Sequence, residues 1–397
     1  GRYTDDEVSA ARHLFAWLTV VLLATVGVAT SAATGVAKAA WSPTASEHTF
    51  VANAYPTYVA SGSFSAGVVN GSIASNGDAL VVWDQYEDRG GSNRSFHNWL
   101  VSNFDGQTMS WSSPVETGCA SGTGNAIAIS SSGWAHHVCT SWVLLPSGSQ
   151  RERLYVESSN ATLALDDTGV LQAACATNPG CEPSVVPDGL VTDDDGNALA
   201  VWCNSGSRAY AFFSASTRTW GAAHAFTSSY PNWCLFRTKV VANAGGSAVV
   251  TYQSDNINNY AAVANLATQT MGDPSFVGTG NNGWVPLPYV SQSGDVAIVT
   301  CNSHNETAVR SYRAGSWDPV VAISGTECSS DPLASFVSQG HLMLLRGVSS
   351  GGKSYVKSKV FNITTQTWGL DKSVGSVDVD MKVFGADGGG VSHFLYS

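Results

Sequence analysis

Residues 192–202 read "TDDDGNALAVW", three aspartates and a glycine that run directly into a strand-like apolar stretch. The same order, a polar turn ending in glycine and then an apolar run, recurs along the chain. The glycines at this position are Gly77, Gly133, Gly196, Gly246, Gly294, Gly340 and Gly389. Consecutive glycines are 56, 63, 50, 48, 46 and 49 residues apart. A period near fifty residues with several short strands per unit is typical of the blades of a β-propeller.

A second landmark closes five of these units: an aromatic residue or methionine that follows a short polar turn. The positions are Trp111, Trp220, Met271, Trp317 and Trp368. The clearest unit reads as four strands, separated by Gly, Asn, Ser and Asp: 184–192, 197–203, 209–216 and 219–226. The sequence therefore predicts an all-β fold, a single propeller of seven blades with four antiparallel strands each. Six blades are the alternative.

The seventh unit, residues 380–397, supplies only two strands before the chain stops. The segment "WSP" at 41–43 is similar to "WSSP" at 111–114 in the first complete unit. We therefore expect residues 41–50 to pair with the C-terminal strands and complete the last blade. Such closure removes open sheet edges, which could otherwise pair with other chains.

The aspartates of the opening stretch have three interpretations: a calcium loop, a catalytic acid cluster or a turn. A calcium loop needs alternating oxygen ligands and a late bidentate acid, whereas Asp193, Asp194 and Asp195 are contiguous. Asn-Gly and Asp-Gly pairs favour type I′ hairpin turns. The turn is the interpretation we adopt, and no metal site is predicted here.

The N-terminal segment is of a different kind. Residues 14–30 are apolar and follow Arg12 and His13, and Ala37-Lys38-Ala39 offers a small-x-small cleavage site. This pattern is typical of a secretory signal peptide, with an uncleaved membrane anchor as the alternative. We divide the chain into a signal peptide or anchor, 1–39, and a propeller domain, 40–397. The expected location is secreted, extracellular or at the cell surface.

Composition limits the partners. The 397 residues carry a net charge of −11, and only 12% of them are charged. An acidic chain without a basic stripe is not expected to bind nucleic acid, and a membrane is a partner only if the N-terminal segment is retained. No dinucleotide fingerprint, phosphate loop or Gly-x-Ser-x-Gly motif is present, so no cofactor is expected.

The eight cysteines suit an oxidising compartment. The repeat suggests the pairs Cys119–Cys139, Cys175–Cys181, Cys203–Cys234 and Cys301–Cys328. A metal site at "HHVC", 136–139, is the alternative. On a strand the two neighbouring histidines point to opposite faces, and the chain has no C-x-x-C pair, which favours disulfides.

A ligand site is expected where loops follow each second strand, because these Asn-, Ser- and Gly-rich loops differ most between units. Aromatic rings beside short polar groups suit a sugar, which stacks an apolar face and hydrogen-bonds through its hydroxyls. The candidate ligand-binding residues are Trp83, Tyr86, Trp142, Trp202, Arg208, Tyr252, Asn302 and His304. The competing interpretation is that the large side chains fill gaps between neighbouring blades.

The strands "DDDGNALAVW" (193–202) and "AYAFFSASTRTWG" (209–221) resemble a repeat of uncharacterised secreted or surface proteins of bacteria. The resemblance extends over residues 68–397 and is closest around Gly196. It implies a propeller and an extracytoplasmic location, not a reaction. Sialidases are similar in architecture, but their Asp-box, Ser-x-Asp-x-Gly-x-Thr-Trp, is not met; 102–111 is the nearest approach.

Three functions follow as hypotheses. The first is a non-catalytic module that binds glycans or a protein partner. The second is a propeller glycoside hydrolase of the sialidase-like class, in which Asp84, Glu87 or Asp255 would supply a carboxylate pair. The third is a membrane-anchored structural or assembly unit of a surface layer or appendage. The missing motifs favour binding over catalysis, without deciding whether the protein is an enzyme.

Overall fold

The structure is a computed structural model. It describes residues 63–88, 95–120, 125–144, 150–160, 166–172, 185–204, 207–226, 238–254, 257–279, 286–302, 304, 306–327, 333–338, 340–350, 353–376, 381–386 and 392–396. Every regular element in these ranges is a β-strand. Within the same ranges, no helix has the length and apolar character needed to span a membrane. The all-β prediction is confirmed.

The strands repeat in the predicted order. The first strands of the units are β1 (Ser63–Ile73), β6 (Asn125–Ile129), β10 (Val185–Thr192), β15 (Thr238–Ala242), β20 (Leu287–Val290), β25 (Leu333–Ser338) and β30 (Met381–Ala386). The second strands are β2 (Ala79–Asp88), β7 (Trp134–Leu144), β11 (Ala198–Asn204), β16 (Ser247–Gln253), β21 (Val296–Cys301), β26 (His341–Ser350) and β31 (Ser392–Tyr396). Each first strand pairs antiparallel with its second strand.

Third strands follow in six units: β3 (Ser95–Asp105), β8 (Gln150–Asn160), β12 (Ser207–Ser214), β17 (Asn258–Asn265), β22 (Glu306–Arg313) and β27 (Lys353–Asn362). The Trp or Met landmarks lie in two-residue strands: β4 (Ser110–Trp111), β13 (Thr219–Trp220), β18 (Thr270–Met271), β23 (Ser316–Trp317) and β28 (Thr367–Trp368). The outer edge is completed by β5 (Val115–Ala120), β9 (Asp166–Gln172), β14 (His224–Ala225), β19 (Ser275–Thr279), β24 (Val321–Glu327) and β29 (Lys372–Ser376). The predicted fourth strand is therefore two short pieces wherever a landmark occurs.

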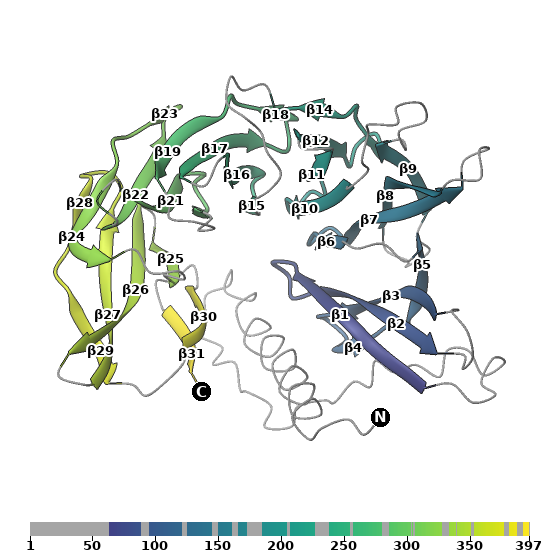
Figure 1. Cartoon of the computed structure of the whole chain (residues 1–397), viewed down its shortest axis with the longest axis horizontal. Helices are drawn as coiled ribbons and strands as arrows, with labels where there is room; N and C mark the ends of the chain where they lie inside the picture. The colour runs from purple at the N-terminus through teal and green to yellow at the C-terminus, as the bar shows by residue number, and fades with distance from the viewer. Residues whose placement is uncertain are drawn as a thin grey trace.

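The sheets are arranged around a common centre, with their first strands innermost (Figure 1). Each first strand contacts the first strand of the next unit, from β1 through β6, β10, β15, β20 and β25 to β30. This is the arrangement of propeller blades. One bridge, Thr279 to Cys301, joins β19 to β21, so that two units form a continuous ten-stranded sheet.

The core lies between neighbouring units because successive side chains of a strand point to opposite faces. On β16, Ala248, Val250 and Tyr252 pack against the preceding unit. Val249, between them, packs against Val296 of the following unit. The second strand of a unit is thus buried on both faces, which explains why its sequence is almost continuously apolar.

Gly77, Gly133, Gly196, Gly246 and Gly294 form a different turn from the one predicted, because the N–H of each donates to the carbonyl three residues earlier. Gly77, Gly133, Gly196, Gly246, Gly294 and Gly340 have φ values between 72° and 91°. The N–H of Gly77 donates to the carbonyl of Ala74 at 3.0 Å, and Ser75 and Asn76 do not share its positive φ. A type I′ turn needs positive φ at both central residues, whereas a type I turn followed by a left-handed glycine does not. The type I′ prediction is wrong, and the requirement for glycine is confirmed.

Of the three aspartates, Asp193 has the clearest structural role. Its carboxylate accepts hydrogen bonds from the backbone N–H and side-chain amide of Asn197, at 2.8 and 2.9 Å, across the hairpin turn. Asp194 links neighbouring turns: its N–H donates to Ala244 and its carbonyl accepts from the N–H of Ser132. Asp195 is exposed. The turn interpretation of this stretch agrees with these contacts.

The blade count and the ring closure remain predictions. Seven units contribute strands, the last with β30 and β31 alone among the described residues. Residues 41–50, which we expect to close the ring, lie outside the described residues, as does the segment 1–39.

Candidate functional site

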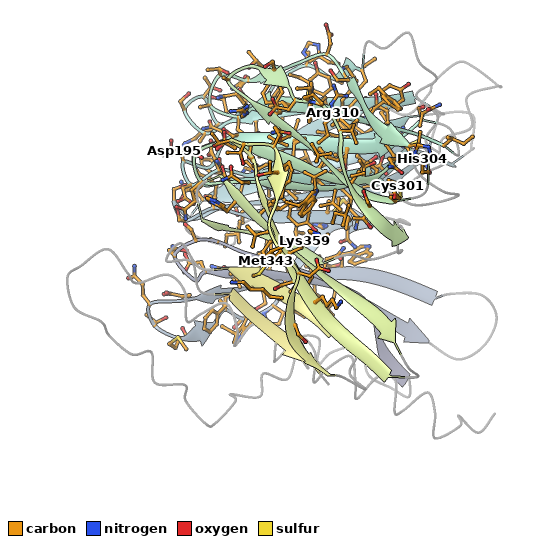
Figure 2. The ribbon with its side chains drawn as sticks, turned by 90° about the vertical axis from the view of Figure 1, so that its left-hand side faces the viewer. Asp195, Cys301, His304, Arg310, Met343 and Lys359 are labelled. Atoms are coloured by element: carbon orange, nitrogen blue, oxygen red, sulfur yellow. A yellow bond between two sulfur atoms is a disulfide. The ribbon has the colours of Figure 1, made fainter. Side chains whose placement is uncertain are left out.

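The two ends of the sheets have different character. The glycine turns lie at one end, which we call the hairpin end. The opposite end, the loop end, holds the start of each first strand, the end of each second strand and the start of each third strand. Asp195 of the hairpin end lies on one side of the molecule, and Cys301 and His304 of the loop end lie on the other (Figure 2).

A buried polar cluster lies at the loop end between the third and fourth units. The backbone shifts register between Pro187 and Gly189, so Asp188 occupies a bulge on the innermost strand β10. The hydroxyl of Thr238, at the start of β15, donates to Asp188 Oδ2 at 2.9 Å. The same hydroxyl accepts from Nε of Arg208 on β12, also at 2.9 Å. A guanidinium, a hydroxyl and a carboxylate thus form one hydrogen-bonded chain across two units.

Electrostatics in this cluster are set by burial. Arg208 Nε is 3.9 Å from Asp188 Oδ2, and the guanidinium lies over the ring of Tyr252 at 4.6 Å from its centroid. Desolvation raises the pKa of Asp188, although the hydrogen bond from Thr238 and the charge of Arg208 oppose this rise. Desolvation likewise lowers the pKa of Arg208. Both pKa shifts show that the charged form of the group is disfavoured in this cluster, as expected when a side chain is removed from water.

A second polar cluster lies at the loop end between the fourth and fifth units. Thr251 donates to the carbonyl of Pro286 at 2.7 Å, and the Asn259 amide donates to the Thr300 hydroxyl at 3.2 Å. Gln253, opposite Asn259 in the strand register, is fully buried. Neutral amides and hydroxyls therefore line the seam, that is, the boundary between these two units.

The turn after β21 is an exposed part of the loop end. The side-chain carbonyl of Asn302 accepts from the backbone N–H groups of His304 and Glu306, both at 2.9 Å. Its amide donates to the Glu306 carboxylate at 2.8 Å. Asn302 thereby braces the turn and leaves His304 exposed to solvent. This turn presents an imidazole to solvent.

The predicted ligand-binding residues divide into three groups. Four of them are buried inside the protein, each at most 2% exposed: Trp83, Trp202, Arg208 and Tyr252. Asn302 and His304 lie at the surface turn just described. The side chains of Tyr86 and Trp142 lie outside the described residues, as do those of Asp84, Glu87 and Asp255.

Burial limits what the first group can do directly. Trp202 packs in a cluster with Trp134 and Val138 of the preceding unit, and Trp83 packs with Val81 and Leu100. For Trp202 this is the packing between neighbouring units that the competing interpretation expects, whereas the cluster of Trp83 lies within its own unit. The ligand-binding role of these residues stays a prediction, and in this conformation it would be indirect.

Several polar residues at the loop end had no sequence signal. Asp188, Thr238, Gln253 and Asn259 do not belong to any motif, and each lies within an ordinary strand pattern. The one available hint was "PDG" at 187–189, in which a proline and a glycine flank an acid inside a strand. Such a pattern is typical of a bulge.

Among the cysteines, the structure joins Cys119 to Cys139, as the predicted pairing has it, with Cα atoms 6.0 Å apart. Cys203 and Cys301 are also disulfide-bonded. Their predicted partners, Cys234 and Cys328, and the pair Cys175–Cys181 lie outside the described residues.

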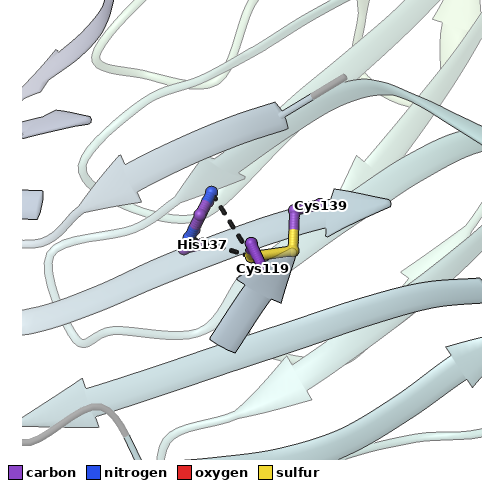
Figure 3. A group of neighbouring side chains, drawn as sticks. All are labelled: Cys119, His137 and Cys139. Carbon is purple, nitrogen blue, oxygen red and sulfur yellow. Dashed lines mark hydrogen bonds between the residues drawn. A yellow bond between two sulfur atoms is a disulfide. The ribbon is translucent and has the colours of Figure 1, made fainter. Parts of the chain in front are cut away.

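The two adjacent histidines point to opposite faces, as expected for a strand. His136 is fully buried, with Nε2 3.2 Å from the Gly196 carbonyl and Nδ1 2.9 Å from the Ser158 hydroxyl. Because a carbonyl only accepts, Nε2 carries the proton and Nδ1 accepts from Ser158. Burial lowers the pKa of His136 to about 4. His137 faces the other way, toward Cys119 (Figure 3).

No family model matches this chain, and no curated protein matches it. Among solved structures, it is similar to a polysaccharide lyase, the PL25 ulvan lyase, at 9% identity, with a TM-score of 0.40, 77% of this chain and 83% of that one covered. It is also similar to the β-propeller domain of the Trilobed protease from Pyrococcus furiosus, at 10% identity, with a TM-score of 0.40 and 86% and 91% covered. A third similarity is to the NanB sialidase of Streptococcus pneumoniae, at 11% identity, with a TM-score of 0.40 and 81% and 63% covered. Likenesses this distant carry no argument about activity.

Proposed function

We propose that this protein is a secreted or cell-surface β-propeller that acts as a non-catalytic binding module, for a glycan or for a protein partner. Its ring has seven blades and is closed by residues 41–50. Ligand binding takes place at the loop end, and the turn that carries His304 contacts the ligand.

One observation carries the proposal: the loop end combines a braced, exposed turn with seams of neutral hydrogen-bonding groups. Thr251, Asn259 and Thr300 supply hydroxyls and amides rather than net charge, but they are buried and bonded within the protein, so they support the loop end without contacting a ligand. The exposed imidazole of His304 is the group that can hydrogen-bond a sugar hydroxyl or a peptide backbone. Glu306, the acid nearest the exposed turn, is held by the amide of Asn302, which is a scaffolding role rather than a catalytic one.

A glycoside hydrolase is the second candidate, and one observation favours it. Asp188 lies on a bulge of an innermost strand, and burial raises its pKa. A carboxylic acid with a raised pKa is the group that protonates a leaving sugar oxygen in such enzymes. The hydrogen bond from Thr238 and the nearby Arg208 work against this role because both favour the ionised form.

A glycan array with the full chain tests the binding module, and two surface variants locate the site. His304→Ala changes an exposed residue of the loop end, and Asp195→Ala is the matched control, because it is exposed at the hairpin end. We expect His304→Ala to weaken binding about fivefold, the value of one hydrogen bond worth about 1 kcal/mol. The control should bind as the parent does.

Equal weakening in both variants would contradict a site at the loop end. A protein partner captured with the same dependence on His304, and no glycan bound, would decide for the protein ligand. Turnover of chromogenic glycosides that is abolished by Asp188→Asn would replace the binding module with the hydrolase.

A further inference from the structure

Four side chains of types that bind metals meet at the buried boundary between the first and second units. Cys119 is the second-last residue of the outer strand β5 of the first unit, and His137 and Cys139 lie two residues apart on β7. Glu157 on β8 is the register partner of His137. All four are buried, with at most 3% of each exposed. Figure 3 shows the imidazole of His137 next to the sulfur of Cys119, which is 3.4 Å from Nδ1 and 3.8 Å from Nε2.

The strand geometry explains why they meet. Residues two apart on a strand share a face, so His137 and Cys139 both point toward the first unit. A cross-strand partner also shares that face, which places Glu157 beside His137. The disulfide then links the outer strand of one unit to the second strand of the next.

We propose that reduction of the Cys119–Cys139 disulfide converts this cluster into a Zn²⁺ site, with two thiolates, the imidazole of His137 and the carboxylate of Glu157 as ligands. The site is separate from the ligand site at the loop end and does not depend on it.

The observed spacing suits tetrahedral zinc. His137 Nδ1 is 3.4 Å from Cys119 Sγ and 3.7 Å from Glu157 Oε2. Ligand atoms of Cys119, His137 and Cys139 all lie within 4.8 Å of one another. Zinc bonds of about 2.0–2.3 Å in a tetrahedron place neighbouring ligand atoms about 3.3–3.8 Å apart. Breaking the disulfide lets the two sulfurs separate. The Glu157 carboxylate must also move toward the sulfurs, because it lies outside the group of three residues whose ligand atoms are within 4.8 Å of one another.

The donor set also suits this metal. Thiolate, imidazole and carboxylate are the ligands that zinc uses in proteins, and structural sites have four protein ligands. Two thiolates and one carboxylate overcompensate the metal charge by one unit. Burial excludes water, as expected for a structural rather than a catalytic site.

The conversion is balanced. The disulfide accepts two electrons and two protons from a dithiol reductant, which itself becomes a disulfide, and two thiols result. Zinc binding then releases both thiol protons, because thiolate is the ligand. The link between the two units is therefore kept in both redox states, covalently when oxidised and through the metal when reduced.

The experiment uses the full chain, reduced with a dithiol, freed from it without oxygen and titrated with Co²⁺ as a spectroscopic probe for zinc. We expect one equivalent of Co²⁺ with the absorption of a tetrahedral thiolate site. The Cys119→Ser/Cys139→Ser variant should lose this signal. The Cys203→Ser/Cys301→Ser variant, which removes two cysteines elsewhere, should keep it and is the matched control.

Two further measurements keep the test decisive. Because the cysteine variant could fail to fold, His137→Gln and Glu157→Gln, which retain both cysteines, are titrated in parallel. Each should weaken Co²⁺ binding by about tenfold or more. The unreduced parent should bind no Co²⁺ at this site. If the reduced parent and the Cys119→Ser/Cys139→Ser variant give the same spectrum, or if neither His137→Gln nor Glu157→Gln weakens binding, the proposal is wrong.

Discussion

Gly196 and Gly77 allow a test of how the repeat is built, because they share a backbone conformation and differ in their surroundings. Both have φ of 91°. A Cβ added at Gly77 would meet nothing within 4 Å. At Gly196 it would overlap Trp134, approaching Cγ to 2.6 Å and Cβ to 3.0 Å. Alanine at the two positions therefore separates backbone strain from steric overlap.

Trp134 has little room to move. It is 7% exposed, stacks on His136 with ring centroids 6.0 Å apart, and meets the edge of Phe213 at 5.1 Å. His136 in turn contacts the carbonyl of Gly196 itself. A methyl group at Gly196 must therefore displace several packed rings or the turn.

The expected magnitudes follow from these contacts. Left-handed backbone costs an alanine about 1–2 kcal/mol, and this cost applies to Gly77→Ala and Gly196→Ala alike. Overpacking adds about 1–3 kcal/mol at Gly196 alone. We expect the free energy of unfolding to fall by about 1–2 kcal/mol in Gly77→Ala and by about 2–5 kcal/mol in Gly196→Ala.

Urea denaturation followed by tryptophan fluorescence measures both losses. A Trp134→Ala background provides a control because it removes Cγ, which the added Cβ would approach to 2.6 Å, and the ring beyond it. There, Gly196→Ala should cost about as much as Gly77→Ala. Equal losses for the two glycine variants in the parent, or no relief from Trp134→Ala, would refute the packing argument.

Three further predictions concern acid, the chain ends and the cysteines. The folded pKa of His136, about 4, lies below its ordinary value of 6.5, so the unfolded chain takes up the proton first. The parent should keep its full free energy of unfolding above about pH 6.5 and lose about 3 kcal/mol of it as the pH falls to 4. In urea titrations, His136→Gln should lack this part of the pH dependence. If the free energy of unfolding of His136→Gln changes with pH as that of the parent does, this prediction is wrong. Deleting residues 40–50 should lower the melting temperature by several degrees or cause aggregation, as calorimetry and light scattering would detect, and a silent deletion would end the closure model. Removing the Cys203–Cys234 pair should cost about 2–4 kcal/mol, and peptide mapping without reduction should recover that pair rather than free thiols.

Much of the fold could be predicted because its signals are local. The glycine turns depend on the φ of a single residue, and each apolar run follows its turn within the same short segment. The fold class and the units therefore follow from the periodicity. The turn type was mistaken because Asn76-Gly77 suits both alternatives locally, and the length of the loop between the paired strands decides between them.

The candidate site could be predicted only in part. The surface position of Asn302 and His304 could be predicted because a polar loop after an apolar strand is visible in the sequence, and their ligand-binding role stays a prediction. Arg208 was expected to contact a ligand, but its surroundings include Thr238, thirty positions away, which burial brings into contact with it.

What the sequence by itself determined is the repeat: strands, turns and their order, since these depend on neighbouring residues and on backbone sterics. What only the tertiary structure decided is which faces meet between units. Trp134 against Gly196, and Cys119 beside His137 and Glu157, are contacts between segments that the ring brings together. Their chemistry arises from burial, which removes water from side chains that the sequence alone would leave as ordinary strand residues.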